Sequence, residues 1–207
     1  MNSNNQIKKI ENYAFVRQTS IDIEKLTHLC MSINNNLKII LDEQNDDYVD
    51  DSYIAPLSTR CYNQYNLICF VKPPLHAVYS IVRDTFRQIV GRNVGSKDYF
   101  MQCWLNIFSE KSPALGWHSH FEEEIDAYHG FLVVKANNSY TEYKKPDNSK
   151  FKVTSKDGLL VMTKSFQDLH RTSPVEKGET RITIAFDIVT SKSLSNYNYV
   201  STHWIPI

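Results

Sequence analysis

The chain has 207 residues, a length at which one domain with a sizeable core is expected. Hydrophobic residues make up 42% of it and charged residues 22%, which excludes wholesale disorder, a collagen-like sequence and a coiled coil. Lys and Arg total 23, and so do Asp and Glu, so the formal net charge is zero. Proteins that bind polyanions normally carry a basic excess, and nucleic acid is therefore an unexpected partner.

The cysteines and the hydropathy of the chain indicate its compartment. Cys30, Cys61, Cys69 and Cys103 form no CxxC pair, so neither a disulfide scaffold nor a zinc ribbon is predicted. Residues 1–12 are polar and lack the apolar core of a signal peptide, and no run of about 18 apolar residues occurs. We therefore expect a cytoplasmic protein with reduced thiols and no contact with a membrane.

The N-terminal part of the chain predicts one strand and one helix. A short strand is expected at residues 13–16. Ser20 can cap a helix, and apolar residues then recur at helical spacing from Ile23 to Ile33. Three asparagines at 34–36 break this pattern and predict the end of the helix.

The next segment combines an acidic loop, an apolar stretch and the clearest helix. Residues 42–52 are acidic and polar and predict a surface loop, whereas residues 65–71 are apolar enough for a strand. A helix is expected from Pro73, because proline is well tolerated in the first helical turn. One apolar stripe follows at helical spacing as far as Val90.

From Tyr99 onward the hydrophobic period changes to two, which is the period of a β-strand. Turn signals separate about eight short strands in about 90 residues, and this density predicts a sandwich or barrel, with a jelly roll as the natural candidate. The strands are expected at residues 99–107, 115–120, 128–136, 140–144, 150–154, 158–163, 169–173 and 180–189.

The whole chain is expected to form one mainly β domain with flanking helices. Residues 99–190 would be the β core, and residues 1–98 would support it with helices and a strand. Residues 191–207 carry several aromatic side chains and are expected to pack back on the core as a tail.

Three histidines of the β region stand at positions that suit a metal. His118 and His120 are two residues apart, so in a strand both side chains would point to the same face. His170 lies fifty residues later, on another expected strand. Three such ligands that leave open positions are typical of non-haem Fe(II) oxygen chemistry. A His-x-His pair by itself is a weak indication, because surface and core histidines explain most such pairs.

A cation and a hydroxyl follow on the last expected strand. Arg181 and Thr183 share one face of residues 180–189, while the apolar residues occupy the other. A guanidinium matches a carboxylate with two parallel hydrogen bonds, and a hydroxyl two residues away adds a further donor. Inside a barrel this pair would hold the far carboxylate of a dicarboxylic co-substrate. The alternative is a solvated arginine on an edge strand.

Taken in order, these segments resemble the Fe(II)/2-oxoglutarate-dependent oxygenase superfamily. More narrowly, they resemble the 2-oxoglutarate oxygenases of bacteria, phages and viruses that are related to the prolyl hydroxylases. The resemblance covers roughly residues 99–189, under half of the chain. It rests on Trp104-Leu105-Asn106, Gly116-Trp117-His118-Ser119-His120, His129-Gly130-Phe131-Leu132-Val133-Val134, His170 and Arg181-Ile182-Thr183.

The resemblance implies a double-stranded β-helix fold and a catalytic iron. His118, His120 and His170 would be the ligands of Fe(II), and Arg181 would complete the catalytic set. The implied reaction uses 2-oxoglutarate as co-substrate and O2 as oxidant. It hydroxylates a protein side chain or a small molecule and yields succinate and CO2.

The resemblance also implies how the co-substrate is held. Arg181 and Thr183 would bind the C5 carboxylate of 2-oxoglutarate. Asn106 or Trp104, on the inward face of the first roll strand, would line the same pocket.

One position departs from the family pattern. Most members have His-x-Asp or His-x-Glu, whereas this chain has a histidine at position 120. Either the site uses three histidines, or a carboxylate comes from elsewhere. Candidates in the following segment are Glu122, Glu123, Glu124 and Asp126, and His129 begins the next strand as a candidate hydrogen-bonding neighbour.

Other functions stay open at this point. A three-histidine cupin-type dioxygenase would use the metal without 2-oxoglutarate, but it needs no carboxylate clamp such as Arg181 and Thr183. A non-catalytic metal-binding or ligand-binding jelly roll is favoured by the missing acid at position 120. Three imidazoles also suit zinc. Lysines within residues 144–152 leave a nucleic-acid substrate as a less favoured variant of the oxygenase.

Overall fold

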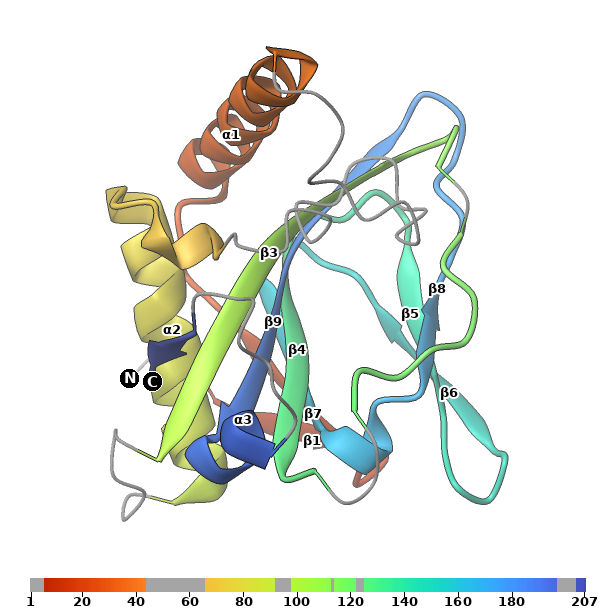
Figure 1. The fold of residues 1–207 in the computed structure, drawn as a ribbon. Helices are drawn as coiled ribbons and strands as arrows, with labels where there is room; N and C mark the ends of the chain where they lie inside the picture. The colour runs from red at the N-terminus through yellow and green to blue at the C-terminus, as the bar shows by residue number, and fades with distance from the viewer. Residues whose placement is uncertain (1–5, 44–65, 92–97, 113, 122–124, 197–203) are drawn as a thin grey trace.

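The computed structural model describes residues 6–43, 66–91, 98–112, 114–121, 125–196 and 204–207. These residues form two antiparallel β-sheets and three α-helices. Figure 1 shows helices α1 (Ile23–Glu43) and α2 (Pro73–Val90) on one side of the large sheet and the small sheet on its other side.

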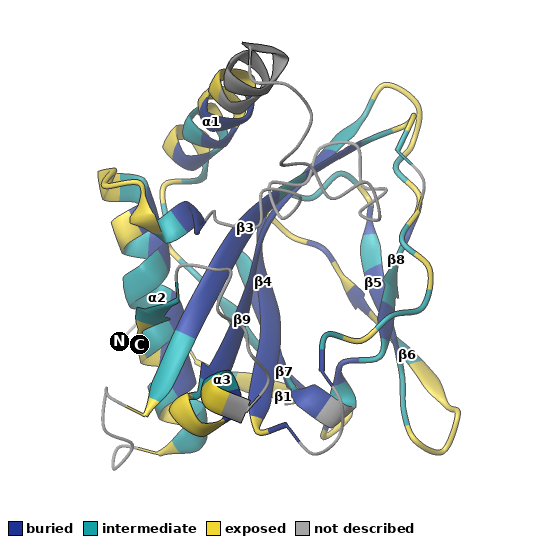
Figure 2. Cartoon of the chain, in the orientation of Figure 1, coloured by how far each residue is buried: buried dark blue, intermediate teal, exposed yellow. Residues whose placement is uncertain are grey.

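The large sheet has seven strands in the order β1-β2-β7-β4-β9-β3-β10. The long strand β9 (Thr180–Thr190) lies between β3 (Tyr99–Ser109) and β4 (Ala127–Lys135), and all three are buried over most of their length (Figure 2). The other members are β1 (Lys8–Ile10), β2 (Ala14–Gln18), β7 (Leu159–Lys164) and β10 (Ile205–Pro206). Strands that are far apart in the sequence therefore pair, as in a jelly roll.

The small sheet has the order β6-β5-β8 and covers the other face. Its strands are β5 (Tyr140–Lys144), β6 (Lys150–Thr154) and β8 (His170–Thr172). Side chains of both sheets meet in one buried cluster that includes Phe131, Tyr143, Val153, Val161 and Ala185. Two sheets packed face to face with helices outside confirm the mainly β, jelly-roll fold predicted from the sequence.

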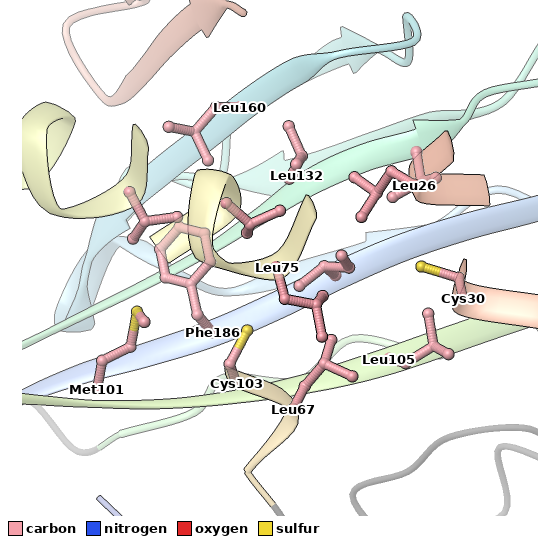
Figure 3. Close-up of a cluster of buried hydrophobic side chains, with 14 of the residues drawn as sticks. Leu26, Cys30, Leu67, Leu75, Met101, Cys103, Leu105, Leu132, Leu160 and Phe186 are labelled. Carbon is pink, nitrogen blue, oxygen red and sulfur yellow. The ribbon is translucent and has the colours of Figure 1, made fainter. Parts of the chain in front are cut away.

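Alternation along β9 gives the large sheet two different faces. Ile182, Ile184 and Phe186 belong to the core on the helix side, where Leu26 of α1 and Leu75 of α2 also pack (Figure 3). Successive side chains of a strand point to opposite faces, so the residues between them face the small sheet. These are Arg181, Thr183, Ala185 and Asp187.

The ends of the chain lie against the core. β1 and β2 extend the large sheet beyond β7, and β10 pairs with β3 at the other edge. A short helix, α3 (Ser191–Asn196), follows β9 directly, and Ile207 is buried in the helix-side core. Among the described helices, none combines the length and the apolar character needed to cross a membrane.

Two predictions for the N-terminal half are wrong. α1 continues through the asparagines at 34–36 as far as Glu43, because asparagine disfavours a helix by less than about 1 kcal/mol per residue. Residues 66–71 contain a 3-10 helix, η3 (Leu67–Cys69), in place of a strand, and the side chain of Asn66 caps it by accepting the N–H of Ile68 at 3.2 Å. Most of the expected acidic loop at 42–52 lies outside the described residues.

Most of the predicted elements are confirmed. The helix from Pro73 ends at Val90 as expected, and seven of the eight strands predicted after residue 98 are present with ends displaced by at most two residues. The eighth, at 115–120, is not a strand. That segment pairs with β8 through a single bridge, which is described below because it belongs to the site.

Candidate metal centre

The main chains of His118 and His170 are paired directly. The N–H of His118 donates to the carbonyl of His170 at 3.0 Å, and the N–H of His170 donates to the carbonyl of His118 at 2.9 Å. This isolated antiparallel bridge joins the segment before β4 to β8 of the small sheet. The bridge replaces the strand predicted at 115–120, and it places the two imidazoles side by side, with ring centroids 4.3 Å apart.

The third imidazole lies next to this pair. The ring centroid of His120 is 5.5 Å from that of His118 and 5.6 Å from that of His170. One nitrogen of each of the three rings lies within 4.8 Å of the others, so these side chains form a group that can hold a metal ion. Metal–imidazole bonds are about 2.0–2.1 Å long, so nitrogens this close to one another could bind a single ion.

Each of the three rings is anchored through the same nitrogen. Nδ1 of His118 lies 2.8 Å from the carbonyl oxygen of Gly116, and Nδ1 of His170 contacts the carbonyl oxygen of Asp168. Nδ1 of His120 lies 3.3 Å from a carboxylate oxygen of Asp187. These oxygens are acceptors, so each Nδ1 carries the proton and each Nε2 keeps the lone pair. Metal-ligating histidines have this arrangement, and the residues therefore fit a divalent metal.

Burial keeps one of these ligands neutral. His170 is 4% exposed. Desolvation, with the neighbouring imidazoles His129, His118 and His120 adding to it, holds the pKa of His170 well below its usual range. A neutral imidazole is the form that binds a metal.

A fourth imidazole and a carboxylate lie behind the group. His129 of β4 faces Asp187 of β9 in the sheet register, and its Nδ1 lies 2.8 Å from Oδ1 of Asp187. The rings of His120 and His129 are nearly parallel, with centroids 3.6 Å apart. Trp104 of β3 stacks against both rings, at 5.6 Å and 6.1 Å.

The charge of Asp187 is stabilised by these two imidazoles. The carboxylate is 2% exposed, and burial by itself raises its pKa. His120 and His129 outweigh that effect and hold the pKa of Asp187 below its usual range. Asp187, His120 and His129 form a second group whose ligand atoms lie within 4.8 Å of one another.

Asp168 supports the site from the small-sheet side. Its Oδ2 accepts the main-chain N–H of His120 at 2.8 Å, while its Oδ1 is buried without a partner among the described residues. Burial raises the pKa of Asp168 to about 7, and the nearby charge of Asp187 acts in the same direction.

The Arg181 side chain lies between the sheets and is 2% exposed. Its Nη2 donates to the hydroxyl of Thr141 at 3.0 Å, but its Nε and Nη1 have no partner among the described residues. The hydroxyl of Tyr143 is likewise buried and unpaired within the described part of the chain. Burial lowers the pKa of Arg181 to about 10. Buried donors left without acceptors indicate a place for an anionic ligand.

The expected site residues are placed as follows. His118, His120 and His170 come together, and the ring of Trp104 stacks on His120. Thr183 is buried and pairs in register with Asn106. On alternation, Thr183 and Arg181 share the face toward the small sheet, and Asn106 lies on that same face of β3 next to Trp104.

Of the expected alternative carboxylates, the structure describes Asp126, which is not part of the three-histidine group. Asp126 is half exposed, and its carboxylate contacts Lys164 at 3.8 Å and the hydroxyl of Tyr99 at 3.2 Å. Residues 122–124 lie outside the described residues. The carboxylate that contacts an imidazole of the group is instead Asp187.

Sequence reasoning missed four residues of the site. Asp187 could have been found from the sequence. It lies on the same face of the strand as Arg181, and its neighbours in the strand are apolar. Thr141 and Tyr143 share a face of the correctly predicted strand 140–144, so the same rule would have grouped them. The sequence gives no such indication for Asp168. This residue follows the 3-10 helix η4 (Ser165–Gln167), outside any strand, so the alternation of side chains does not place it.

The chain is similar to known proteins in its structure and not in its sequence. No protein-family model matches the sequence, and a search of curated proteins finds no significant match. A truncated form of the viral collagen prolyl hydroxylase from Paramecium Bursaria Chlorella virus-1 is 13% identical, with a TM-score of 0.55 over 91% of this chain and 96% of that one. The nickel complex of the non-haem monooxygenase ThoJ is 13% identical, with a TM-score of 0.57 over 81% of this chain and 68% of that one.

Likenesses at such identities concern the fold. Both structures align with most of this chain. The chain therefore has the fold of the viral collagen prolyl hydroxylase and of the monooxygenase ThoJ, which is the fold implied by its resemblance to the Fe(II)/2-oxoglutarate-dependent oxygenases.

Proposed function

We propose that the protein is an Fe(II)- and 2-oxoglutarate-dependent dioxygenase that hydroxylates a protein side chain or a small molecule. The observation that carries this proposal is a pairing of two features between the sheets. Three imidazoles anchored through Nδ1 have one nitrogen each within 4.8 Å of the others, and a buried guanidinium with two unpaired donors lies between the same two sheets. A metal and a dicarboxylate are the ligands that these two features suit.

The three histidines would hold the metal. His118, His120 and His170 would each bind Fe(II) through Nε2, since Nδ1 is engaged elsewhere. With 2-oxoglutarate and O2 the bound iron would supply the hydroxylation of an unactivated C–H bond, coupled to release of succinate and CO2. The small number of protein ligands leaves positions for the co-substrate and for oxygen.

Arg181 would anchor the far end of the co-substrate. Its Nε and Nη1 are free to donate to a carboxylate, and the hydroxyl of Tyr143 can add a third hydrogen bond. The ring of Tyr143 lies 5.6 Å from that of His170, so it connects the anion subsite with the metal group. Thr183, on the same face of β9, would contribute its hydroxyl, and Asn106 and Trp104 would line the wall formed by β3.

Apolar neighbours would keep water out of this space. Phe131 lies under the Arg181 guanidinium, with the ring centroid 5.9 Å from Cζ, and Val133 and Val161 belong to the same buried cluster. In such surroundings a charge pair between a guanidinium and a carboxylate is much stronger than in water. The site would therefore select a co-substrate that carries a carboxylate at the end remote from the metal.

Calorimetry under anaerobic conditions tests the proposal. We expect 2-oxoglutarate to bind in the presence of Fe(II) and to bind more weakly without it, and we expect succinate to form when air is admitted. Glutarate is the matched control, because it has both carboxylates but lacks the keto group that chelates the metal, and it should bind with little dependence on iron. Tight metal binding with no response to 2-oxoglutarate would favour the three-histidine dioxygenase or the non-catalytic binding protein instead.

A further inference from the structure

We propose that Asp187 and His129 are positioning residues of the metal centre, and that Asp187 supplies through His120 the negative charge that three imidazole ligands lack. This inference rests on the proposed metal-binding function. It concerns two residues outside the expected ligand set, one on β9 and one on β4. Their contacts with His120 and with each other carry the argument.

The three candidate ligands are anchored on chemically different acceptors. His118 and His170 are anchored on main-chain carbonyl oxygens, which carry no net charge. His120 is anchored on a carboxylate, whose oxygens lie 3.3 Å from its Nδ1. A carboxylate that accepts the N–H of a metal-bound imidazole fixes the ring and makes it a stronger donor. Asp187 can therefore act on the metal without touching it.

The position of Asp187 is costly unless it has a function of this kind. It is 2% exposed and belongs to a strand whose other residues are mostly apolar. A buried charge destabilises the folded state unless it is paired and hydrogen-bonded. Asp187 meets this condition by accepting from two imidazoles, which ties its placement to His120 and His129. A residue needed only for packing at this position would be apolar.

His129 holds both members of the pair. Its Nδ1 donates to Oδ1 of Asp187 at 2.8 Å, which fixes the carboxylate from the β4 side. Its ring stacks on His120 with a centroid distance of 3.6 Å and an angle of 12°, so it also restricts the plane in which His120 can rotate. His129 therefore orients His120 in two ways, directly by stacking on its ring and indirectly by holding Asp187.

Metal affinity in the absence of 2-oxoglutarate is the first test. Co(II) is the probe, because its visible absorption reports on the ligands, and its dissociation constant is measured by competition with a chelator under anaerobic conditions. Asp187→Asn keeps the shape of the side chain and removes its charge, and we expect the affinity to fall about 10- to 100-fold. Asp126→Asn removes an exposed carboxylate and is the matched control, which should leave the affinity unchanged.

The His129 variants separate positioning from ligation. His129→Phe retains a flat ring for stacking but cannot donate to Asp187, and we expect weaker Co(II) binding with the number of bound ions unchanged. His118→Ala should instead abolish binding, because it removes a ligand. Loss of binding in His129→Phe together with retained binding in His118→Ala would make His129 a ligand and overturn the proposal, as would wild-type affinity in Asp187→Asn.

A measurement on the wild-type protein covers the case in which a variant does not fold. In the Co(II) protein, each histidine bound through Nε2 gives one strongly shifted, solvent-exchangeable ring N–H signal in the proton NMR spectrum. We expect three such signals. Two signals would mean that only two imidazoles bind the metal and that Asp187 takes the place of the third, and four would mean that His129 binds as well, and either result overturns the proposal.

These tests are separable from those of the proposed function. If Asp187→Asn weakens Co(II) binding in a protein that does not respond to 2-oxoglutarate, the positioning role holds and the oxygenase proposal fails. If the protein turns over 2-oxoglutarate and Asp187→Asn binds Co(II) as the wild type does, the positioning role fails and the oxygenase proposal holds.

Discussion

Arg181 donates one hydrogen bond, from Nη2 to the hydroxyl of Thr141 at 3.0 Å, across the space between the two sheets. Its two other nitrogens have no partner among the described residues, although the side chain is 2% exposed. A buried cation with a single neutral partner destabilises the folded state. Arg181 therefore lowers the stability of the ligand-free protein, and its unpaired donors gain hydrogen-bond acceptors when an anion binds.

Replacing this cation should change stability and binding in opposite directions. We expect Arg181→Met to raise the free energy of unfolding of the ligand-free protein by about 1–3 kcal/mol, because it removes unsatisfied buried donors. The same change should weaken 2-oxoglutarate binding by roughly 2–5 kcal/mol and leave metal affinity largely unaltered. Urea unfolding and calorimetry measure the two effects.

The control for this variant is Arg171→Met. Arg171 carries its guanidinium at the surface, 43% exposed, where it pairs with Glu142 at 2.6 Å. Glu142 is 7% exposed, so its carboxylate loses a partner in this variant, which should therefore be less stable than the wild type and should bind 2-oxoglutarate normally. If Arg181→Met and Arg171→Met behaved alike in both measurements, the anion subsite would have to be placed elsewhere.

Removing a ligand should abolish metal binding and leave the fold intact. The contact between His118 and His170 is made by main-chain groups on both sides, so it persists when either imidazole is removed. We expect His170→Ala to show wild-type circular dichroism and no measurable binding of Fe(II), and His28→Ala, on the exposed face of α1, to bind as the wild type does. Retention of tight binding in His170→Ala would exclude the three-histidine centre.

Periodicity made the β core predictable, because the alternation of apolar residues is itself the physical signature of a half-buried strand. The same rule placed Arg181 and Thr183 on one face, and the structure puts that face toward the small sheet. The same alternation places Asp187 on this face as well, and a charged residue in a mostly apolar strand is an indication of function. Most residues of the candidate site can therefore be predicted from the alternation of side chains along the strands and from the order of the histidines in the sequence.

The rest of the candidate site depends on contacts between segments that are far apart in the sequence. His118 and His120 come together with His170, but through a single bridge to β8 and not through the strand that was predicted. No local pattern specifies such a bridge, since its partner lies about fifty residues away. The stacking of His129 on His120 is equally non-local, because it joins β4 to the segment that forms the bridge with β8.

A glycine beside the site is required by close packing. A Cβ atom built on Gly130 would collide with the carbonyl oxygen of Val161 and would come within 2.5 Å of the Phe186 ring. We expect Gly130→Ala to lower the free energy of unfolding by about 1–3 kcal/mol and to weaken metal binding, because β4 must shift and His129 is the adjacent residue. Thermal unfolding with and without Co(II) measures both effects.

Gly116 provides the matched control. It precedes the candidate ligands, and a Cβ at this position would meet nothing within 4 Å. Gly116→Ala should therefore change the free energy of unfolding by less than about 1 kcal/mol. Equal destabilisation in the two alanine variants would show that the close approach of β4 to β7 is not what requires glycine at 130.

Buried thiols should make the protein sensitive to alkali. Cys30 of α1 is fully buried in the helix-side core, and burial raises the pKa of its thiol to about 12 (Figure 3). In the unfolded chain a thiol titrates near pH 8.5. Above that pH the unfolded state loses a proton that the native state keeps, so the free energy of unfolding falls as the pH rises.

The size of this effect can be isolated with a variant. Between pH 7.5 and 9.5 the contribution of one such thiol is about 1 kcal/mol. We expect Cys30→Ala, compared under reducing conditions, to lose stability less steeply over this range than the wild type does, whatever its stability at neutral pH. Cys69 is exposed, so Cys69→Ala should change the slope less. Parallel curves for the wild type and Cys30→Ala would mean that the thiol of Cys30 reaches solvent in the native state, and the packing of α1 on the large sheet would then be looser than Figure 3 shows.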